Sequence, residues 1–221
     1  KIEDFPVNVE GLGTAKANES VSLTAQTTDI VQYINFDDGD FVKKGQVLLQ
    51  LNDTEEKARL NELDINLQEA KRQLKRIINL AKESAASEQL LDEQQAKVKA
   101  LSAQMDVVKS QLDELVISAP FDGVLGIRQI SVGALLKPGD LVTNLDDIAV
   151  VKVDFSISES HLATVAIGQQ VKTTSVAYPG EVFVGKIASI ATRLDPITRS
   201  IQVRANIDNK ALKLRPGMLM Q

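Results

Sequence analysis

The sequence predicts an elongated, multidomain α+β protein. In this fold an antiparallel coiled-coil α-hairpin is inserted between the two halves of a small β-sandwich, and a β-barrel follows. Three observations predict it. Residues 46–119 contain neither glycine nor proline, although both are frequent elsewhere. The segments that flank this gap repeat each other at a constant offset, and the sequence after Val150 alternates short strand-like runs with turns.

Residues 54–113 are predicted to be helical, because they lack aromatic residues and about a third of them are charged, with nearly balanced signs. Apolar residues recur there in alternating steps of three and four, which average about 3.5 residues and are typical of a coiled-coil seam. The first seam comprises Leu60, Leu63, Leu67, Ala70, Leu74, Ile77 and Ala81, and the second comprises Leu91, Gln94, Val98, Leu101, Met105, Val108, Leu112 and Leu115.

The two seams are out of phase, since continuing the first one reaches the polar residues Ser84 and Glu88. We therefore expect a reversal at residues 82–87, with Ser87 as the N-cap of the second helix. Arms of about 27 residues would reach on the order of 40 Å. The alternative is one continuous helix that contains a stutter.

The flanking segments are internal repeats. The stretch Gly39–Leu48 matches Gly133–Val142 at an offset of 94 residues, and the same offset aligns Ala25 with Ala119 without a gap. Each copy is predicted as a strand, a glycine-bounded turn and a second strand. Neither copy alone can bury its apolar face, so we expect the two to close on each other as one sandwich, with the hairpin projecting from between them.

The residues after Val150 are predicted to form a small β-barrel. Its expected strands are Val150–Ile157, Gln170–Ser175, Val182–Thr192 and Ser200–Ile207. Turns are expected at Tyr178-Pro179-Gly180 and Leu194-Asp195-Pro196, and a short amphipathic helix around Glu159–Ala166. The leading segment Pro6–Lys16 has strand character and no partner of its own, so we expect it to pair into the same barrel.

Composition argues against several classes of function. Aromatic residues make up 4% of the chain and tryptophan is absent, so stacking surfaces for nucleic acid or sugars are not expected. The net charge is −5 with scattered basic residues, which argues against binding to a phosphate backbone. The absence of cysteine excludes disulfides and thiol chemistry. No run approaches the roughly 18 apolar residues of a membrane span, and no signal peptide is visible, so we expect a trimmed, mature chain.

This order of elements resembles the periplasmic adaptor, or membrane fusion protein, family of tripartite efflux systems (HlyD-like). It is most similar to the adaptors of resistance-nodulation-division (RND) multidrug pumps. The stretch Gly39–Leu48 resembles the first half of the family's lipoyl-like motif, and Ala119–Val124 resembles the opening of the second half. The stretches Asp195–Ser200 and Leu214–Met218, with Asn209 between them, resemble the closing part of the family's barrel.

The resemblance implies three parts. They are a β-barrel of residues 1–17 and 149–221, a split lipoyl/biotinyl-like domain of residues 18–53 and 114–148, and a coiled-coil α-hairpin of residues 54–113 with its tip near 82–87. One departure is Asp29, which stands where the second repeat has Gly123. Aspartate tolerates a left-handed turn better than most residues, so we expect the same fold at that position.

The candidate site lies at the inferred tip. Arg76, Leu80 and Ser87 fit the spacing that the family carries on the hairpin end that meets the outer-membrane channel. Arg76 offers a forked donor for backbone carbonyls or a carboxylate, and Leu80, one turn later, offers an apolar knob on the same face. Ser87 adds a small hydroxyl on the opposite arm. The alternative is that Arg76 is a solvated flank, Leu80 is ordinary core and Ser87 merely caps a helix.

The resemblance implies a scaffold rather than an enzyme, without catalytic residues, cofactor or metal. Its implied partners are an inner-membrane RND transporter, a TolC-like outer-membrane channel and further copies of the chain in a ring, hexameric in the pump, and no nucleic acid. The implied location is the periplasm, associated with the inner membrane through a part outside this sequence. The second-face apolar residues Ile65, Ile78, Leu90 and Val107 could pack against neighbouring protomers.

Other readings of the sequence stay open. The chain could serve an ATP-driven (ABC) exporter, carry biotin or lipoate, or be a purely structural coiled coil. For a carrier, Lys57 is the nearest candidate for modification, whereas Lys43 and Lys137 are expected to be solvated. His161 is the only histidine and has no second ligand cluster beside it, which argues against a metal site. The absence of cysteine and of a methionine cluster argues against soft-metal handling.

Overall fold

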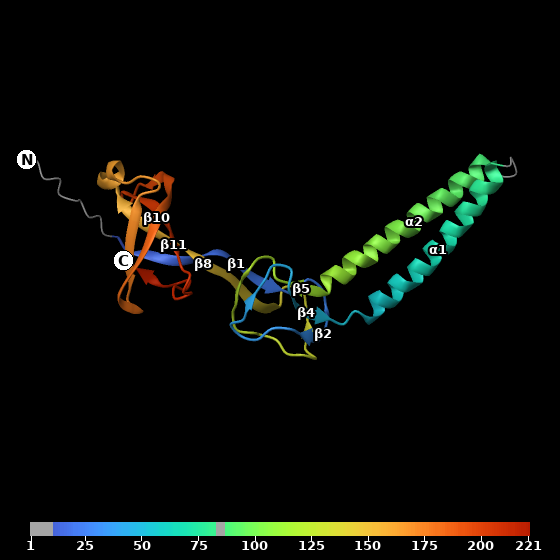
Figure 1. Cartoon of the computed structure of the whole chain (residues 1–221), viewed down its shortest axis with the longest axis horizontal. Helices are drawn as coiled ribbons and strands as arrows, with labels where there is room; N and C mark the ends of the chain where they lie inside the picture. The colour runs from blue at the N-terminus through green and yellow to red at the C-terminus, as the bar shows by residue number, and fades with distance from the viewer. Residues whose placement is uncertain (1–10, 83–86) are drawn as a thin grey trace, which may run out of the picture.

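The computed structural model describes residues 11–82 and 87–221. Figure 1 shows three parts in a row, with a barrel at one end, a sandwich in the middle and two long helices at the other end. Within the described ranges, none of the helices combines the length and apolar character that crossing a membrane requires.

The helical arm consists of α1 (Thr54–Lys82) and α2 (Glu88–Glu114), which lie side by side (Figure 1). Every residue predicted for the two seams is buried or half-buried. Gln94 Nε2 donates a hydrogen bond to the carbonyl of Ala70 at 3.0 Å, although the two residues are 24 positions apart. One continuous helix would separate them by about 36 Å, so the single-helix alternative is wrong.

Ser87 begins α2. Its backbone is extended, with φ −78° and ψ 151°, and its Oγ accepts a hydrogen bond from the Leu90 N–H at 3.2 Å. The N-cap prediction is therefore confirmed, and Glu88 lies in the first turn, where the helix dipole favours an anion. Residues 83–86 of the predicted reversal lie outside the described residues.

The sandwich is built from both repeats. Its strands are β2 (Asp29–Ile34), β3 (Phe41–Val42), β4 (Val47–Leu51), β5 (Val116–Ser118), β6 (Gly123–Leu125) and β7 (Leu135–Leu136). Each strand of the first copy pairs with one of the second, as β2–β7, β3–β6 and β4–β5. Two of these pairings are related by the 94-residue offset, because Phe41 lies opposite Val124 and Leu135 lies opposite Ile30.

The two copies also form hydrogen bonds with each other at the turns between their strands. The Gly45 N–H donates to the carbonyl of Ala119 at 2.7 Å, and the matching Gly139 N–H donates to the carbonyl of Ala25 at 2.9 Å. The glycines that bound each turn have φ between 80° and 92°, a region that glycine enters without a Cβ penalty. Both halves also share one apolar core, in which Leu48, Leu49, Leu51, Val142 and Leu145 are fully buried. The prediction that the two copies close on each other is confirmed.

The fold at Asp29 is kept as expected, but tolerance of a left-handed turn is not the reason, since neither Asp29 nor Gly123 has a positive φ. The two positions differ instead in the space around them. A Cβ at Gly123 would lie 2.7 Å from the backbone oxygen of Asp146 on the neighbouring strand, so only glycine fits there. Asp29 pairs with Leu136 in β7, and its Oδ1 accepts a hydrogen bond from the Ile30 N–H at 2.7 Å.

Six strands close the barrel. They are β1 (Gly13–Thr24), β8 (Leu141–Ser158), β9 (Gln170–Ser175), β10 (Tyr178–Asp195), β11 (Ser200–Asp208) and β12 (Leu219–Met220). They pair in the circuit β1–β12–β9–β10–β11–β8–β1. Val151, Val203, Ile207 and Leu214 are fully buried in it. Part of the leading strand, from Gly13 onward, pairs with β8 and β12 as expected, whereas residues 6–10 lie outside the described part.

Three local predictions for the barrel need correction. The turn expected at Tyr178-Pro179-Gly180 is wrong, because these residues begin β10 and the turn lies at residues 176–177. Pro179 is tolerated in β10 because the pairing with β9 shifts its register between Tyr178 and Phe183. The turn expected around Asp195 lies at residues 196–199. The predicted amphipathic helix is a 3₁₀ segment, η1 (Glu159–Thr164).

The barrel segments that carried the family resemblance have local structural roles. Asp195 Oδ1 accepts hydrogen bonds from the N–H groups of Thr198 at 3.1 Å and Ile197 at 2.8 Å, and these bonds lower the Asp195 pKa. The buried amide of Asn209 donates to the carbonyls of Ile148 and Leu214, both at 2.9 Å. Asn209 therefore ties the closing loop of the barrel to β8.

Two strands run through both the sandwich and the barrel. In the pair β1–β8, Val21 lies opposite Leu145 at the sandwich core, and Ala15 lies opposite Val153 at the barrel core. The register of this pair shifts between Ala17 and Glu19. Because β1 and β8 cross them, the predicted boundaries at 17/18 and 148/149 stay predictions.

Candidate docking site at the hairpin tip

Arg76, Leu80 and Ser87 lie at the end of the helical arm farthest from the sandwich (Figure 1). Arg76 and Leu80 occupy the last two turns of α1, and Ser87 immediately precedes α2. All three side chains are exposed. The fold therefore brings the three predicted residues to one end of the arm and leaves their side chains outside its core.

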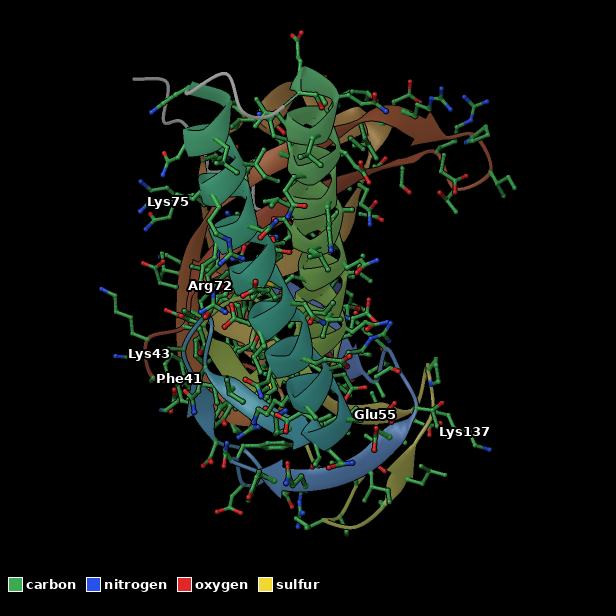
Figure 2. The ribbon with its side chains drawn as sticks, turned by 90° about the vertical axis from the view of Figure 1, so that its right-hand side faces the viewer. Phe41, Lys43, Glu55, Arg72, Lys75 and Lys137 are labelled. Atoms are coloured by element: carbon green, nitrogen blue, oxygen red, sulfur yellow. The ribbon has the colours of Figure 1, made fainter. Side chains whose placement is uncertain are left out.

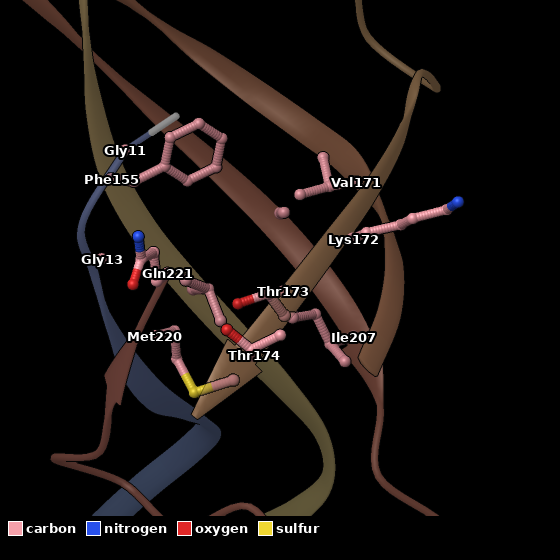
Figure 3. A pocket seen from close by; sticks show the side chains of 12 residues that line it. Gly11, Gly13, Phe155, Val171, Lys172, Thr173, Thr174, Ile207, Met220 and Gln221 are labelled. Carbon is pink, nitrogen blue, oxygen red and sulfur yellow. The ribbon is translucent and has the colours of Figure 1, made fainter. Parts of the chain in front are cut away.

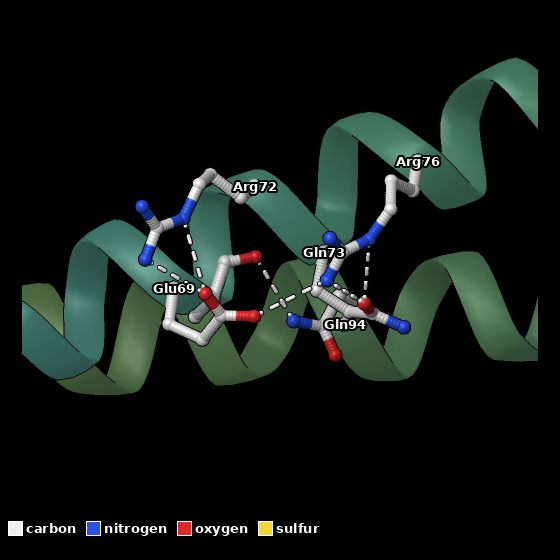
Figure 4. A network of polar contacts seen from close by, with 6 residues as sticks. Glu69, Arg72, Gln73, Arg76 and Gln94 are labelled. Carbon is white, nitrogen blue, oxygen red and sulfur yellow. Dashed lines mark hydrogen bonds and ion pairs between the residues drawn. The ribbon is translucent and has the colours of Figure 1, made fainter.

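The guanidinium of Arg76 is held by its own helix (Figure 4). It donates to Gln73 Oε1 from Nε at 3.0 Å and from Nη2 at 2.5 Å, and Nη2 also donates to Glu69 Oε1 at 3.2 Å. Arg72 pairs with the other Glu69 oxygen at 2.8 Å. The guanidinium of Arg72, and to a smaller degree that of Arg76, lowers the pKa of Glu69 below its ordinary value. The side chain of Arg76 remains 61% exposed, so these contacts orient it without covering it.

Glu69 and Gln73 are functional candidates that the sequence analysis missed. They precede Arg76 by seven and three residues, which places them on the same face of α1. That spacing could have identified them. Which side chain the guanidinium would select, however, depends on rotamers that the spacing does not specify.

Leu80 is 45% exposed, so the alternative that it is ordinary core is wrong. On α2, Leu90 is exposed to a similar degree, 44%. Each of the two leucines directly precedes a seam residue, Ala81 and Leu91 respectively, and in antiparallel helices this position falls on the same side of the seam. The tip thus presents leucines from both helices on one side.

Ser87 caps α2 and is exposed at the same time. The cap uses the hydroxyl oxygen as an acceptor, which leaves the hydroxyl proton free to donate to another group. Capping and contact are therefore compatible roles for this side chain.

The lysines considered for a carrier function do not lie where a lysine that carries biotin or lipoate would be expected. Lys57 lies in the first turn of α1 and pairs with Asp53 at 2.8 Å. Lys43 and Lys137 are exposed in the matching turns of the two repeats and appear on opposite sides of the molecule (Figure 2). Among the described residues there is no group of three acidic, histidine or cysteine side chains that could hold a metal ion, and His161 lies in η1.

A cavity of about 360 Å³ lies in the barrel (Figure 3). Its walls include the buried side chains of Val153, Ile207 and Met220. The hydroxyl of Thr173 is buried there and has no hydrogen-bond partner among the described residues. Lys172 is the one charged side chain among the described lining residues. This lining has no carboxylate or imidazole that could act as a general base.

Comparison with known families matches both β domains. A family model described as the RND membrane fusion protein barrel-sandwich hybrid domain matches residues 19–148, and one described as the CusB-like β-barrel domain matches residues 151–221. The chain belongs to the RND membrane fusion protein family. An uncharacterized protein of Haemophilus influenzae is 32% identical over 213 residues, which cover 96% of the chain and 55% of that protein. Multidrug resistance protein MdtA of Klebsiella pneumoniae is 29% identical over 240 residues, which cover 99% of the chain and 58% of MdtA.

The chain thus spans little more than half the length of these relatives. Two solved structures share its fold. A MacA–MexA chimera that contains the Pseudomonas aeruginosa MexA α-hairpin superposes with a TM-score of 0.81 at 23% identity, covering 95% of this chain and 75% of the chimera. A putative efflux transporter of Bacteroides eggerthii superposes with a TM-score of 0.78 at 20% identity, covering 98% of this chain and 71% of that one.

Proposed function

We propose that this membrane fusion protein is the periplasmic adaptor of a tripartite efflux pump, linking an inner-membrane RND transporter to a TolC-like outer-membrane channel. Its role is that of a scaffold, and it catalyses no reaction. The family membership and the similarity to MdtA support the RND class over an ATP-driven exporter. The ion pair of Lys57 with Asp53, inside the first turn of a helix, argues against a biotin or lipoate carrier.

The single observation that carries the docking proposal is the exposure of Leu80. An apolar side chain that is 45% exposed at the end of a helical arm, beside an oriented arginine, has no role in the core of its own hairpin. Burying such a side chain against a partner helix is favourable, and the Arg76 fork can form directional bonds to that partner's carbonyls or carboxylates. Ser87 is small enough to let the partner helix approach.

The three parts have separate roles in this proposal. The hairpin is a coiled coil that docks on the channel with its tip, the sandwiches of neighbouring copies pack side by side into a ring, hexameric in the pump, and the barrel rests on the transporter. Association with the inner membrane involves a part of the protein outside this sequence.

Cross-linking tests the channel contact directly. The chain has no cysteine, so Leu80→Cys provides a single reactive site for a short cross-linker in cells. We expect a product that contains the outer-membrane channel. We expect none from the control Ile65→Cys, because Ile65 is also apolar and exposed but lies on the middle of the arm. Products from position 65 alone would contradict docking through the tip.

Efflux provides a second readout. Arg76→Asp is expected to abolish drug efflux while leaving the helical circular dichroism unchanged, because the Arg76 side chain is exposed and makes no core contact. Lys109→Asp is the control, because it reverses an exposed charge on the same arm away from the tip, and it should leave drug efflux unchanged. Unchanged drug susceptibility in the Arg76→Asp variant would contradict the proposed role of Arg76 in docking.

A further inference from the structure

The cavity in the barrel is lined by residues of β1, β8, β9, β11 and β12 (Figure 3). Elsewhere the interior of the barrel is filled by side chains such as Val151 and Val203, which are fully buried. Around the cavity, Gly11, Gly13 and Ala205 contribute at most a methyl group, so space remains. Its volume of about 360 Å³ falls within the range of about 300–1,000 Å³ that is typical of pockets for small molecules.

The larger side chains of the lining are apolar, and all of them are buried or half-buried. They are Val153, Phe155, Val171, Ile207 and Met220. Lys172 is exposed, and in Figure 3 its side chain extends from β9 in the direction opposite to the Thr173 hydroxyl, as successive residues of a strand do. The cation of the described lining thus points out of the barrel, and the cavity suits an uncharged molecule with an apolar body.

Thr173 gives this apolar lining one polar group. The residue is 4% exposed, and its Oγ1 is the one buried side-chain polar atom without a hydrogen-bond partner among the residues that the structure describes. The next inward residue of β9, Ser175, does have a partner, since its Oγ accepts from the Ala177 N–H at 3.4 Å. An unpaired buried hydroxyl costs free energy. A lone water beside Thr173 would lack the further polar partners that ordered waters have, because the buried side chains around it are apolar.

We propose that the barrel binds a small, uncharged and mainly apolar molecule in this cavity. Its body packs against Val153, Phe155 and Ile207, where burial of apolar surface is favourable. A carbonyl oxygen on the molecule accepts a hydrogen bond from the Thr173 hydroxyl and so satisfies it. The barrel then has a ligand-binding role in addition to its role in the scaffold. This inference goes beyond the proposed function and does not depend on it.

Methionine-methyl NMR of the purified full-length protein tests binding with two probes. The probes are 2-acetylnaphthalene and 2-ethylnaphthalene, which have nearly the same shape and differ in the carbonyl group. Met220 lies in the cavity wall, and its signal is assigned with Met220→Leu, whereas Met105 lies on the hairpin and serves as the internal reference. We expect each probe to shift the Met220 signal saturably and to leave the Met105 signal in place. A Met220 signal that neither probe shifts would mean that the cavity holds water only, and would overturn the proposal.

Thr173→Val then tests the hydrogen bond, because valine keeps the shape of threonine and lacks the hydroxyl. We expect the variant to bind 2-acetylnaphthalene about fivefold more weakly and to bind 2-ethylnaphthalene as the wild type does. In urea unfolding without a probe, the variant should be at least as stable as the wild type, since it removes an unpaired buried hydroxyl. An equal change for the two probes, or a less stable barrel, would show that the hydroxyl does not await a ligand and would overturn the proposal.

A larger side chain in the lining tests the location of the site. Val171→Phe fills the cavity and should abolish binding of both probes. Val176→Phe is the matched control, because Val176 is 84% exposed and lies outside the lining, and it should leave binding unchanged. Undiminished binding in the Val171 variant, with its fold verified by circular dichroism, would place the probes elsewhere and contradict the proposal. The assay contains neither transporter nor channel, so its failure would leave the adaptor function intact.

Discussion

Arg204 donates hydrogen bonds to both carboxylate oxygens of Asp154, from Nε at 2.6 Å and from Nη2 at 2.8 Å. Lys16 adds a third contact at 2.9 Å, so one buried carboxylate joins β11, β8 and β1. The Arg204 hydrogen bond, with the help of Lys16 and against the effect of burial, lowers the pKa of Asp154 from 3.8 to about 2.

Replacing this carboxylate should weaken the barrel. Asp154→Asn leaves Arg204 and Lys16 without their anion, and we expect a loss of about 3 kcal/mol in the free energy of unfolding at neutral pH, measured with urea. Because the folded-state pKa lies below the unfolded one, the stabilisation is complete above pH 3.8 and is lost as the pH falls through about 2. The variant should lack this acid-dependent part. Asp106→Asn, at an exposed ion pair, is the control and should change stability by less than about 1 kcal/mol.

Two glycines of the sandwich should respond to alanine for different reasons. Gly123→Ala places a Cβ 2.7 Å from a backbone oxygen, so we expect a loss of about 2 kcal/mol from overpacking. A Cβ at Gly39 would have no atom within 4 Å, so Gly39→Ala should lose only about 1 kcal/mol, because alanine is strained at a φ of 80°. Thermal unfolding of the two variants measures the difference. A larger loss at Gly39 would contradict the steric role of Gly123.

Two apolar residues of α1, one turn apart, separate stability from docking. Ile77 is 3% exposed in the seam, so Ile77→Ala should lower the free energy of unfolding of the hairpin by about 3 kcal/mol. Leu80→Ala should change it by less than about 0.5 kcal/mol and yet reduce efflux. Helical circular dichroism during thermal unfolding, together with drug susceptibility, gives both readouts. A stability loss at Leu80 comparable to that at Ile77 would place Leu80 in the core after all.

The two roles of Ser87 can be separated by a substitution that keeps the cap. Ser87→Ala removes the acceptor for the Leu90 N–H and should cost about 1 kcal/mol of hairpin stability. Ser87→Asn retains a capping oxygen and should keep the stability, while its larger side chain should weaken docking of the channel. Cross-linking from position 80 reports on docking in the Asn variant. If Ser87→Asn cross-links and exports as well as the wild type, then Ser87 has only the capping role.

The hairpin and the pairing of the two repeats could be predicted because both follow from regular spacings of residues in the sequence. A seam residue such as Val108 is buried because it falls on the coiled-coil period, and the hydrogen bond from Gly45 to Ala119 has its counterpart 94 residues later. These features depend on the positions of apolar residues and glycines alone, which one sequence displays.

The features that escaped prediction depend on which strands and side chains meet. The contact of Asp154 with Arg204 spans 50 residues and requires the register of β8 against β11. The need for glycine at position 123 comes from the approach of the Asp146 backbone, not from its own turn. At the tip, the sequence predicted the position of Arg76 but not that Gln73 and Glu69 orient its guanidinium.

The continuity of β1 and β8 has a mechanical consequence. Two antiparallel strands, paired from Gly13 to Thr24 with a register shift between Ala17 and Glu19, pass from the barrel into the core of the sandwich, so no hinge of single-stranded chain separates these two parts. A tilt of the barrel would therefore be carried through the sandwich as rotation of a stiff ribbon and would reappear as a sideways displacement at the far end of the long arm. In such a molecule, a small rotation of the barrel would produce a large displacement of the hairpin tip.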